Sequence, residues 1–193
     1  MSLIEETIEP IKGEITTGAF AHPLMNRILK AYGRRAFTRS SACMGFIRFL
    51  DEIKAGGGVA LEIGTYHGIT ALLLAERFDK VISVSVDDED PGRLMKRELA
   101  DFAGISNIEF HDCKSNAEKG EIVRAARFDF CYSDGDHTND TRADWELVRR
   151  CGRVLFHEVW PLQPPVWNLV HELPRDEVTF CDHDILAFWK RRA

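Results

Sequence analysis

The stretch Val59–Ala75, VALEIGTYHGITALLLA, decides the fold of this chain. Its first three residues are apolar and predict a buried strand that ends at Glu62. Gly64 and Gly68 then bound a turn in which the backbone can adopt positive φ and a ligand can come close. The apolar residues that follow predict a helix, whose N-terminus points a partial positive charge back at that ligand. The stretch indicates a cofactor site, and the alternative, an ordinary strand–turn–helix without a ligand, fits the stretch equally well.

The spacing of the glycines bears on which cofactor would bind. A dinucleotide-binding turn has the pattern G-x-G-x-x-G and an acid roughly twenty residues further on. The turn from Gly64 to Gly68 lacks that pattern and is preceded by a carboxylate, Glu62. A carboxylate at this position suits a ligand that carries positive charge, and S-adenosylmethionine carries both an ammonium and a sulfonium group.

Length and composition limit the kinds of protein that this can be. A chain of 193 residues suits one α/β domain, 1–193, with an N-terminal arm and helical cap over 1–57 and a cofactor-binding core over 58–193. The formal charge of -6 argues against nucleic acid as an obligatory partner. Five scattered cysteines without a C-x-x-C motif fit free thiols in a reducing cytosol. No apolar run reaches membrane-spanning length, so we expect a cytoplasmic protein with no membrane partner.

Strand and helix patterns alternate from Val59 onward. This alternation predicts a Rossmann-like parallel sheet with right-handed crossovers and helices on both faces, closed by a C-terminal antiparallel hairpin. Two further helices, predicted to begin near His22 and Ser40, precede the first strand. Their expected role is packing, and the alternative is that they lie across the open end of the sheet. The predicted strands cover residues 59–61, 81–86, 108–110, 128–132, 153–156, 178–181 and 185–189.

Polar residues follow the predicted strands. Because ligands sit at the carboxyl ends of parallel strands, these residues should share one rim; they are Glu62, Asp87, Ser115, Asp134 and Glu158. If the fourth and fifth strands are neighbours, Asp134 converges with His157 and Glu158 in a divalent-metal site. Oxygen ligands alone would favour magnesium, and an imidazole tilts the choice toward manganese, iron or zinc. The alternative is that Asp134 caps the following turn and Glu158 is solvated.

His137 lies three residues after Asp134, in the segment YSDGDH that follows the fourth strand. An imidazole that titrates near neutrality can act as a general base on a substrate hydroxyl. The alternative is a histidine with a structural or surface role, which is the expectation for the other histidines.

Three segments resemble one family. EIGTYHGIT resembles the cofactor loop of class I S-adenosylmethionine-dependent methyltransferases, and is closest to the small metal-dependent O-methyltransferases of the catechol type. FDFCYSDGDHTNDTRADWE resembles the D-G-D-H segment of small methyltransferases that include enzymes acting on antibiotic sugars, and GRVLFHEVW resembles their next strand. The resemblance extends over about Val59 to Trp160.

The resemblance implies a role for each matched residue. The methionine part of the cofactor would be held by the loop residues Glu62, Gly64, Thr65, Tyr66, Gly68 and Thr70. Ser85 stands where an acid usually binds the ribose, so Asp87 is the expected substitute. The adenine would lie along Cys113 to Ser115. Asp134 would serve the cofactor site, catalysis and metal binding, with His157 and Glu158 as further metal ligands, and His137 would take the proton of the substrate.

These features together predict transfer of a methyl group from S-adenosylmethionine to a hydroxyl of a small molecule, with metal assistance, His137 assistance or both. The N-terminal helices and the loop 160–167 would close the pocket. One alternative is a metal-dependent hydroxylase or hydrolase on the same scaffold, and another is a non-catalytic cofactor-binding module. A nucleic-acid or protein methyltransferase is disfavoured, because DGDH stands where base-modifying enzymes carry [N/D]-P-P-[Y/F]. Homo-oligomer formation stays open.

Overall fold

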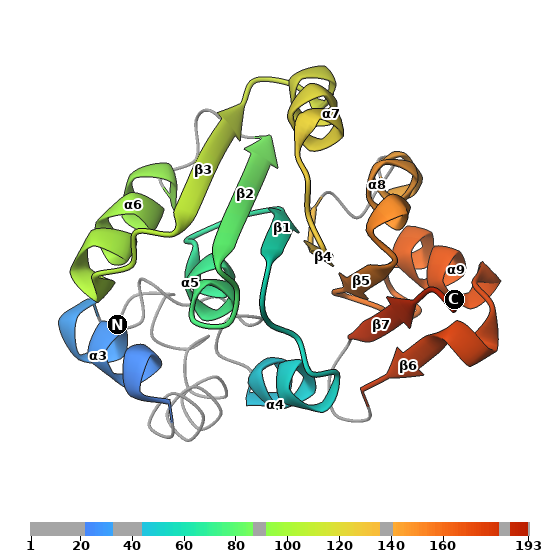
Figure 1. The fold of residues 1–193 in the computed structure, drawn as a ribbon, viewed down its shortest axis with the longest axis horizontal. Helices are drawn as coiled ribbons and strands as arrows, with labels where there is room; N and C mark the ends of the chain where they lie inside the picture. Colours follow the sequence, from blue (N-terminus) through green and yellow to red (C-terminus); the bar gives the residue numbers. More distant parts are fainter. Residues whose placement is uncertain (1–21, 33–43, 87–91, 136–140, 182–185, 193) are drawn as a thin grey trace, which may run out of the picture.

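A seven-stranded sheet organises the chain (Figure 1). The computed structural model describes residues 22–32, 44–86, 92–135, 141–181 and 186–192. The strand order is β3-β2-β1-β4-β5-β7-β6. β1 to β5 run parallel, while β7 pairs antiparallel with both β5 and β6. The strands are β1 (Val59–Ile63), β2 (Lys80–Val86), β3 (Ile108–Cys113), β4 (Phe130–Ser133), β5 (Arg153–Phe156), β6 (Val178–Phe180) and β7 (Ala187–Lys190).

This topology confirms the predicted parallel sheet with its closing hairpin, and it corrects several strand bounds, among them the carboxyl ends of β1 and β3. β1 continues to Ile63, so Glu62 lies inside the strand and not at its end. The reason is that Ile63 still pairs with both neighbouring strands, opposite Val84 and Ser133. β3 extends to Cys113 because its ladder with β2 continues that far.

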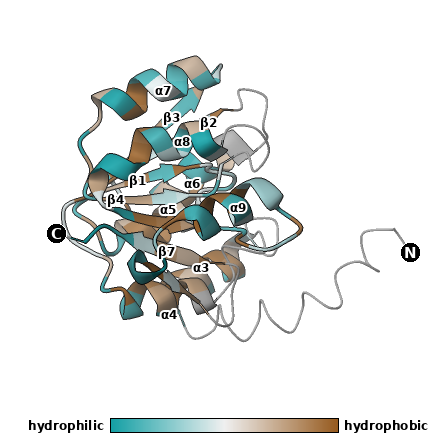
Figure 2. Ribbon diagram, turned by 90° about the vertical axis from the view of Figure 1, so that its right-hand side faces the viewer, coloured by the Kyte–Doolittle hydropathy of each residue, from teal (hydrophilic) through white to brown (hydrophobic). Residues whose placement is uncertain are grey.

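Helices cover both faces of the sheet, as the alternating pattern predicts. One hydrophobic cluster contains α3, α4, α5 and α6, and the other contains α7, α8 and α9. In Figure 2 hydrophobic residues run along α3 and α4, against the first of these faces. The helices are α3 (Pro23–Tyr32), α4 (Met44–Glu52), α5 (Ile69–Ala75), α6 (Gly92–Ala103), α7 (Asn116–Ala125), α8 (Thr141–Val148) and α9 (Pro164–Glu172), with 3₁₀ turns at Arg149–Cys151 and Arg175–Glu177.

The side chains of each strand alternate between these two clusters. Ala60 of β1 belongs to the α3–α6 side, whereas Leu61 and Ile63 belong to the α7–α9 side. Glu62 has the parity of Ala60, so its carboxyl group points toward α5 and α6. An ionisable group is thereby buried in the layer between the sheet and these helices.

The two N-terminal helices pack on the side of α5 and α6. The ring of Tyr32 in α3 meets Phe102 of α6 edge to face, with centroids 5.3 Å apart. Phe46 of α4 meets Tyr132 of β4 in the same way at 5.1 Å. These contacts account for their apolar faces; a part in closing a substrate pocket stays a prediction.

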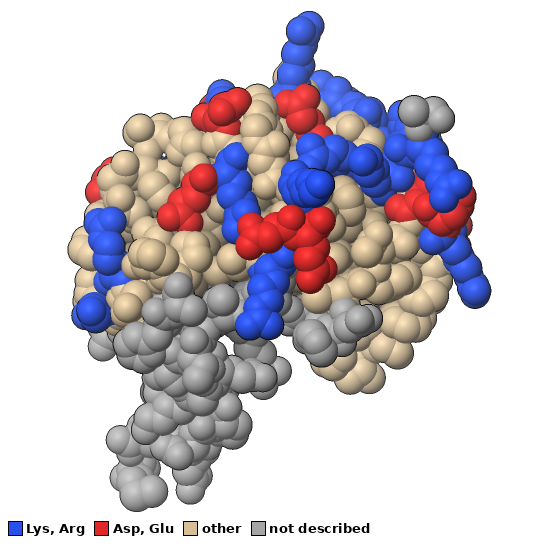
Figure 3. All heavy atoms as spheres, turned by 60° about the horizontal axis from the view of Figure 1, so that its bottom comes forward, with Lys and Arg blue, Asp and Glu red and all other residues tan. Residues whose placement is uncertain are grey.

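The surface carries charges of both signs. Figure 3 shows lysine and arginine side chains interspersed with aspartate and glutamate on the face that it displays. Exposed pairs such as Arg192 with Asp176, 2.7 Å apart, are typical of this surface. Such pairs contribute roughly 0–1 kcal/mol each to stability. No helix in the described ranges is long and apolar enough to cross a membrane.

Candidate cofactor and catalytic site

The ends of β1 and β4 form the centre of the candidate site. These neighbouring strands lie where the strand order reverses, and in open parallel sheets ligands bind at the carboxyl edge of that point. The amide of Asp134 donates to the carbonyl of Ile63 at 2.8 Å. A Cβ built on Gly64, whose φ is +89°, would lie 1.9 Å from the carbonyl oxygen of Asp134. The cofactor loop and the acid segment therefore touch, as the sequence predicts, and only glycine fits at their contact.

The loop from Gly64 to Gly68 has the backbone that its glycines predict. Gly68 has φ of +80° and directly precedes α5. Between the glycines, the side chain of Tyr66 is 56% exposed and stacks on His67, with ring centroids 3.9 Å apart. The loop thus presents a tight backbone turn and an exposed aromatic ring at the edge where a cofactor would bind.

Glu62 faces inward, beneath this loop. Its side chain is 0% exposed and accepts hydrogen bonds from the hydroxyl groups of Thr65, Thr70 and Ser83, with O–O distances of 3.0 Å for Thr65 and 2.6 Å for Ser83. Burial raises the pKa of Glu62 to about 7, although the three hydroxyl donors act in the opposite direction, and the charge of Asp134 adds to the rise. Through these hydrogen bonds, the carboxyl group connects the loop at Thr65 to α5 and β2. Direct contact of Glu62 with a cofactor stays a prediction.

Asp134 joins the ends of β4 and β5. The Nδ1 atom of His157 lies 2.6 Å from its Oδ1 atom, and the hydroxyl of Tyr132 donates to its Oδ2 atom at 3.0 Å. Burial and the charge of Asp134 raise the pKa of Tyr132 well above its ordinary value, which keeps this hydroxyl protonated. Main-chain pairing fixes the geometry, since the amide of His157 donates to the carbonyl of Ser133 at 3.1 Å.

Two of the three predicted metal ligands, Asp134 and His157, are paired with each other in this arrangement. Asp134 and His157 direct a carboxylate oxygen and a ring nitrogen at each other. Within the described residues, no group of three or more His, Cys, Asp and Glu side chains could hold a metal ion. Glu158 has a left-handed backbone with φ of 57°, a conformation that is costly outside glycine. The metal stays a prediction.

The remaining predicted residues lie around the same edge or outside the described ranges. Ser115 caps α7, because its Oγ atom accepts a hydrogen bond from the backbone amide nitrogen of Glu118 at 3.3 Å. Cys113 is buried at the end of β3. Asp87 and His137 fall outside the described residues, so their roles as ribose ligand and general base stay predictions.

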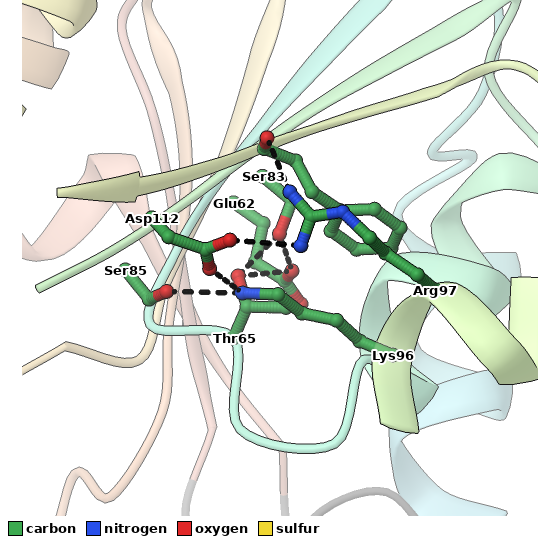
Figure 4. Close-up of polar contacts among 8 residues, drawn as sticks. Glu62, Thr65, Ser83, Ser85, Lys96, Arg97 and Asp112 are labelled. Carbon is green, nitrogen blue, oxygen red and sulfur yellow. Dashed lines mark hydrogen bonds and ion pairs between the residues drawn. The ribbon is translucent and has the colours of Figure 1, made fainter. Parts of the chain in front are cut away.

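Several polar residues of the site did not emerge from the motifs. They are Ser83, Lys96, Arg97 and Asp112, which Figure 4 shows together with Ser85, the residue at the expected ribose position. Tyr132, the partner of Asp134, is a further one. A signal for the two serines was present, because they alternate with valine in the segment VISVSV and so mark one polar face of an apolar strand.

Comparison with solved structures identifies the architecture. A methyltransferase from Geobacter sulfurreducens superposes with a TM-score of 0.64 at 13% identity, over 89% of this chain and 89% of that chain. An O-methyltransferase from Bacillus cereus, solved in complex with SAH (S-adenosylhomocysteine), superposes with a TM-score of 0.61 at 15% identity, over 86% of this chain and 90% of that chain. A ribosomal protein L11 methylase from Lactobacillus delbrueckii subsp. bulgaricus superposes with a TM-score of 0.58 at 16% identity, over 77% of this chain and 78% of that chain.

In sequence, no protein-family model and no curated protein matches the chain. The structural likeness extends over most of the chain. At identities near 15% this likeness shows the fold alone. The chain has the Rossmann-like fold of the class I S-adenosylmethionine-dependent methyltransferases.

Proposed function

We propose that this protein transfers a methyl group from S-adenosylmethionine to a hydroxyl group of a small molecule. The observation that carries the proposal is the contact between Gly64 and the carbonyl of Asp134. It joins a glycine turn suited to the cofactor with the acid segment that would face the acceptor. The solved structure of similar fold that holds S-adenosylhomocysteine supports the choice of cofactor.

The residues at this edge fit such a cofactor. The turn from Gly64 to Gly68 offers close approach to the backbone, and the exposed ring of Tyr66 offers an apolar surface beside it. S-adenosylmethionine, when bound, supplies a methyl group already activated by its sulfonium. The protein has only to align the acceptor oxygen and to help it lose a proton, and alignment alone is worth several kcal/mol.

We assign the proton to His137, which stands three residues after Asp134, as the general base. Asp134 would keep the end of β4 in place through its hydrogen bonds with His157 and Tyr132. A divalent metal on Asp134, His157 and Glu158 would require these hydrogen bonds to rearrange, so no step here depends on one. O-directed transfer follows from the resemblance of the loop and of the DGDH segment.

Isothermal titration with S-adenosylhomocysteine tests the cofactor half of the proposal. We expect the wild type to bind the ligand saturably at one site per chain. The variant Tyr66→Ala should bind it much more weakly or not at all, because the substitution removes the exposed ring and leaves the core intact. A folded wild-type protein that gives no heat with this ligand would contradict the proposal. Transfer of labelled methyl groups to hydroxylated and to amino acceptors in parallel then tests the O-directed half.

A further inference from the structure

A buried ion pair lies beside the cofactor loop and has no part in the chemistry proposed above. Lys96 of α6 and Asp112 of β3 are each 2% exposed in their side chains, and the ammonium Nζ of Lys96 contacts Oδ1 of Asp112. The same ammonium donates to the hydroxyl Oγ of Ser85 at 3.2 Å (Figure 4). The pair thus links one helix to the ends of two strands.

Asp112 stays ionised in this setting. Burial raises its pKa, but hydrogen bonds from Lys96 and Arg97 outweigh that effect and leave the pKa below its ordinary value. Arg97 reaches Oδ2 of Asp112 at 2.8 Å from a side chain that is 47% exposed. A buried ion pair is weak evidence for stability, because the cost of removing both charges from water offsets their attraction. The placement of the pair is therefore more informative than its energy.

That placement brings Lys96 against the loop. A Cβ built on Gly68 would lie 2.6 Å from the Cβ of Lys96, so α6 contacts the turn directly. Ser85 and Asp112 are register partners on β2 and β3, and the side chains of both reach the Lys96 ammonium. Two residues before Ser85, Ser83 contributes to the hydrogen bonds that hold Thr65 of the same loop.

We infer that Lys96 is a positioning residue for the cofactor loop, acting through its ion pair with Asp112. The pair fixes α6 against the ends of β2 and β3, and the backbone of α6 in turn holds the left-handed Gly68 in place. In this inference Lys96 acts through the loop, because its ammonium is buried on Asp112 and Ser85. The inference rests on the proposed function, in which this loop binds S-adenosylmethionine.

The first test is titration of S-adenosylhomocysteine into the wild type and three variants. We expect Lys96→Met to weaken binding about ten-fold or more, because small misplacements of a binding loop are costly. Lys96→Arg keeps the charge and should recover part of the affinity. The matched control is Leu99→Ala, which creates a cavity. Leu99 lies in the same helix, about one turn after Lys96, and is buried in the apolar cluster. It should destabilise the fold comparably yet bind within roughly three-fold of the wild type.

Equal affinity of folded Lys96→Met and wild type would overturn the inference, and so would equal losses in Lys96→Met and Leu99→Ala. If Lys96→Met does not fold, the double variant Lys96→Met/Asp112→Leu replaces both charges by apolar groups, which is often tolerated. It should fold and still bind about ten-fold more weakly; unchanged binding overturns the inference.

A second readout separates this inference from the proposed function. Amide hydrogen exchange over residues 64–68 should be faster in the Lys96 variants than in the wild type and Leu99→Ala, without any ligand. If the wild type fails to bind S-adenosylhomocysteine, the proposed function fails, and hydrogen exchange alone decides whether Lys96 holds the loop. Unchanged exchange across all variants overturns the inference.

Discussion

The Nδ1 atom of His157 lies 2.6 Å from the Oδ1 atom of Asp134, which joins the carboxyl ends of β5 and β4 by a direct side-chain hydrogen bond. Both residues were predicted from the sequence as metal ligands that converge at this edge. They do converge, but as hydrogen-bonding partners, with Tyr132 on the second oxygen of the carboxylate. This geometry leads to the first two predictions.

The hydrogen bond between Asp134 and His157 should be measurable as a coupling free energy. Because a carboxylate is one partner, a double-mutant cycle with Asp134→Asn and His157→Gln should give about 1–3 kcal/mol. Urea unfolding of the two single variants, the double variant and the wild type gives this energy. Tyr132→Phe is the control, since it removes only the hydroxyl from the same carboxylate and should cost less than either substitution. Additive losses would show that the two side chains do not interact in solution.

Removal of divalent metals should leave turnover of a competent acceptor within about two-fold of the untreated protein. The physical reason is that the candidate ligands Asp134 and His157 are already bonded to each other. Exhaustive dialysis against a chelator, followed by a methyl-transfer assay with and without added Mg²⁺ or Mn²⁺, checks this outcome. A loss of turnover that either ion restores would reinstate the metal site predicted from the sequence.

Gly64→Ala should destabilise the protein and abolish binding of S-adenosylhomocysteine. A Cβ at this position would lie 1.9 Å from a main-chain oxygen, and the backbone is left-handed, so we expect a loss of about 3 kcal/mol or more. Gly104→Ala is the matched control, because Gly104 has a similar φ of +73° but nothing within 4 Å of a built Cβ. That substitution should cost about 1–2 kcal/mol from backbone strain alone. Comparable losses in the two variants would mean that Gly64 is not sterically confined.

The sequence was sufficient for the layout of the sheet. The β-branched run 81–86 predicts β2, which begins one residue earlier, at Lys80. The glycine turn and the DGDH segment predict that β1 and β4 end at one edge, and the contact of Gly64 with Asp134 confirms it. These features are local or follow from the handedness of parallel crossovers, so a single sequence carries them.

Side-chain partners were not predictable in the same way. The hydrogen bond from Ser83 to Glu62 joins residues 21 positions apart, and the pair of Lys96 with Asp112 joins a helix to a strand. Such partners depend on rotamers and register at the ends of different strands, which periodicity does not determine. The same limit explains why β1 was expected to end at Glu62. A glutamate inside a buried strand is unfavourable unless three hydroxyl groups from elsewhere satisfy it.

Glu62 provides the last prediction, which concerns pH. Its pKa in the folded protein is about 7, whereas the ordinary value is 4.5. Between pH 4.5 and about pH 7, the folded state therefore keeps a proton on Glu62 that the unfolded state has lost. The contribution of Glu62 to the free energy of unfolding must fall as pH rises through this window, and it levels off above pH 7. At 1.36 kcal/mol per pKa unit, the fall is about 3 kcal/mol at most.

Glu62→Gln removes this titrating group, and the hydroxyl groups of Thr65, Thr70 and Ser83 can rotate to meet an amide. Urea unfolding at pH 5, 6, 7 and 8 should show that the wild type loses more stability than Glu62→Gln as pH rises. The charge of Asp134 adds to the rise in the pKa of Glu62, so Asp134→Asn should shrink the same pH effect without removing it. Parallel pH profiles for the wild type and Glu62→Gln would mean that the carboxyl group of the folded protein is already ionised from pH 5 upward. The hydroxyl groups around it would then be bonded to a buried carboxylate.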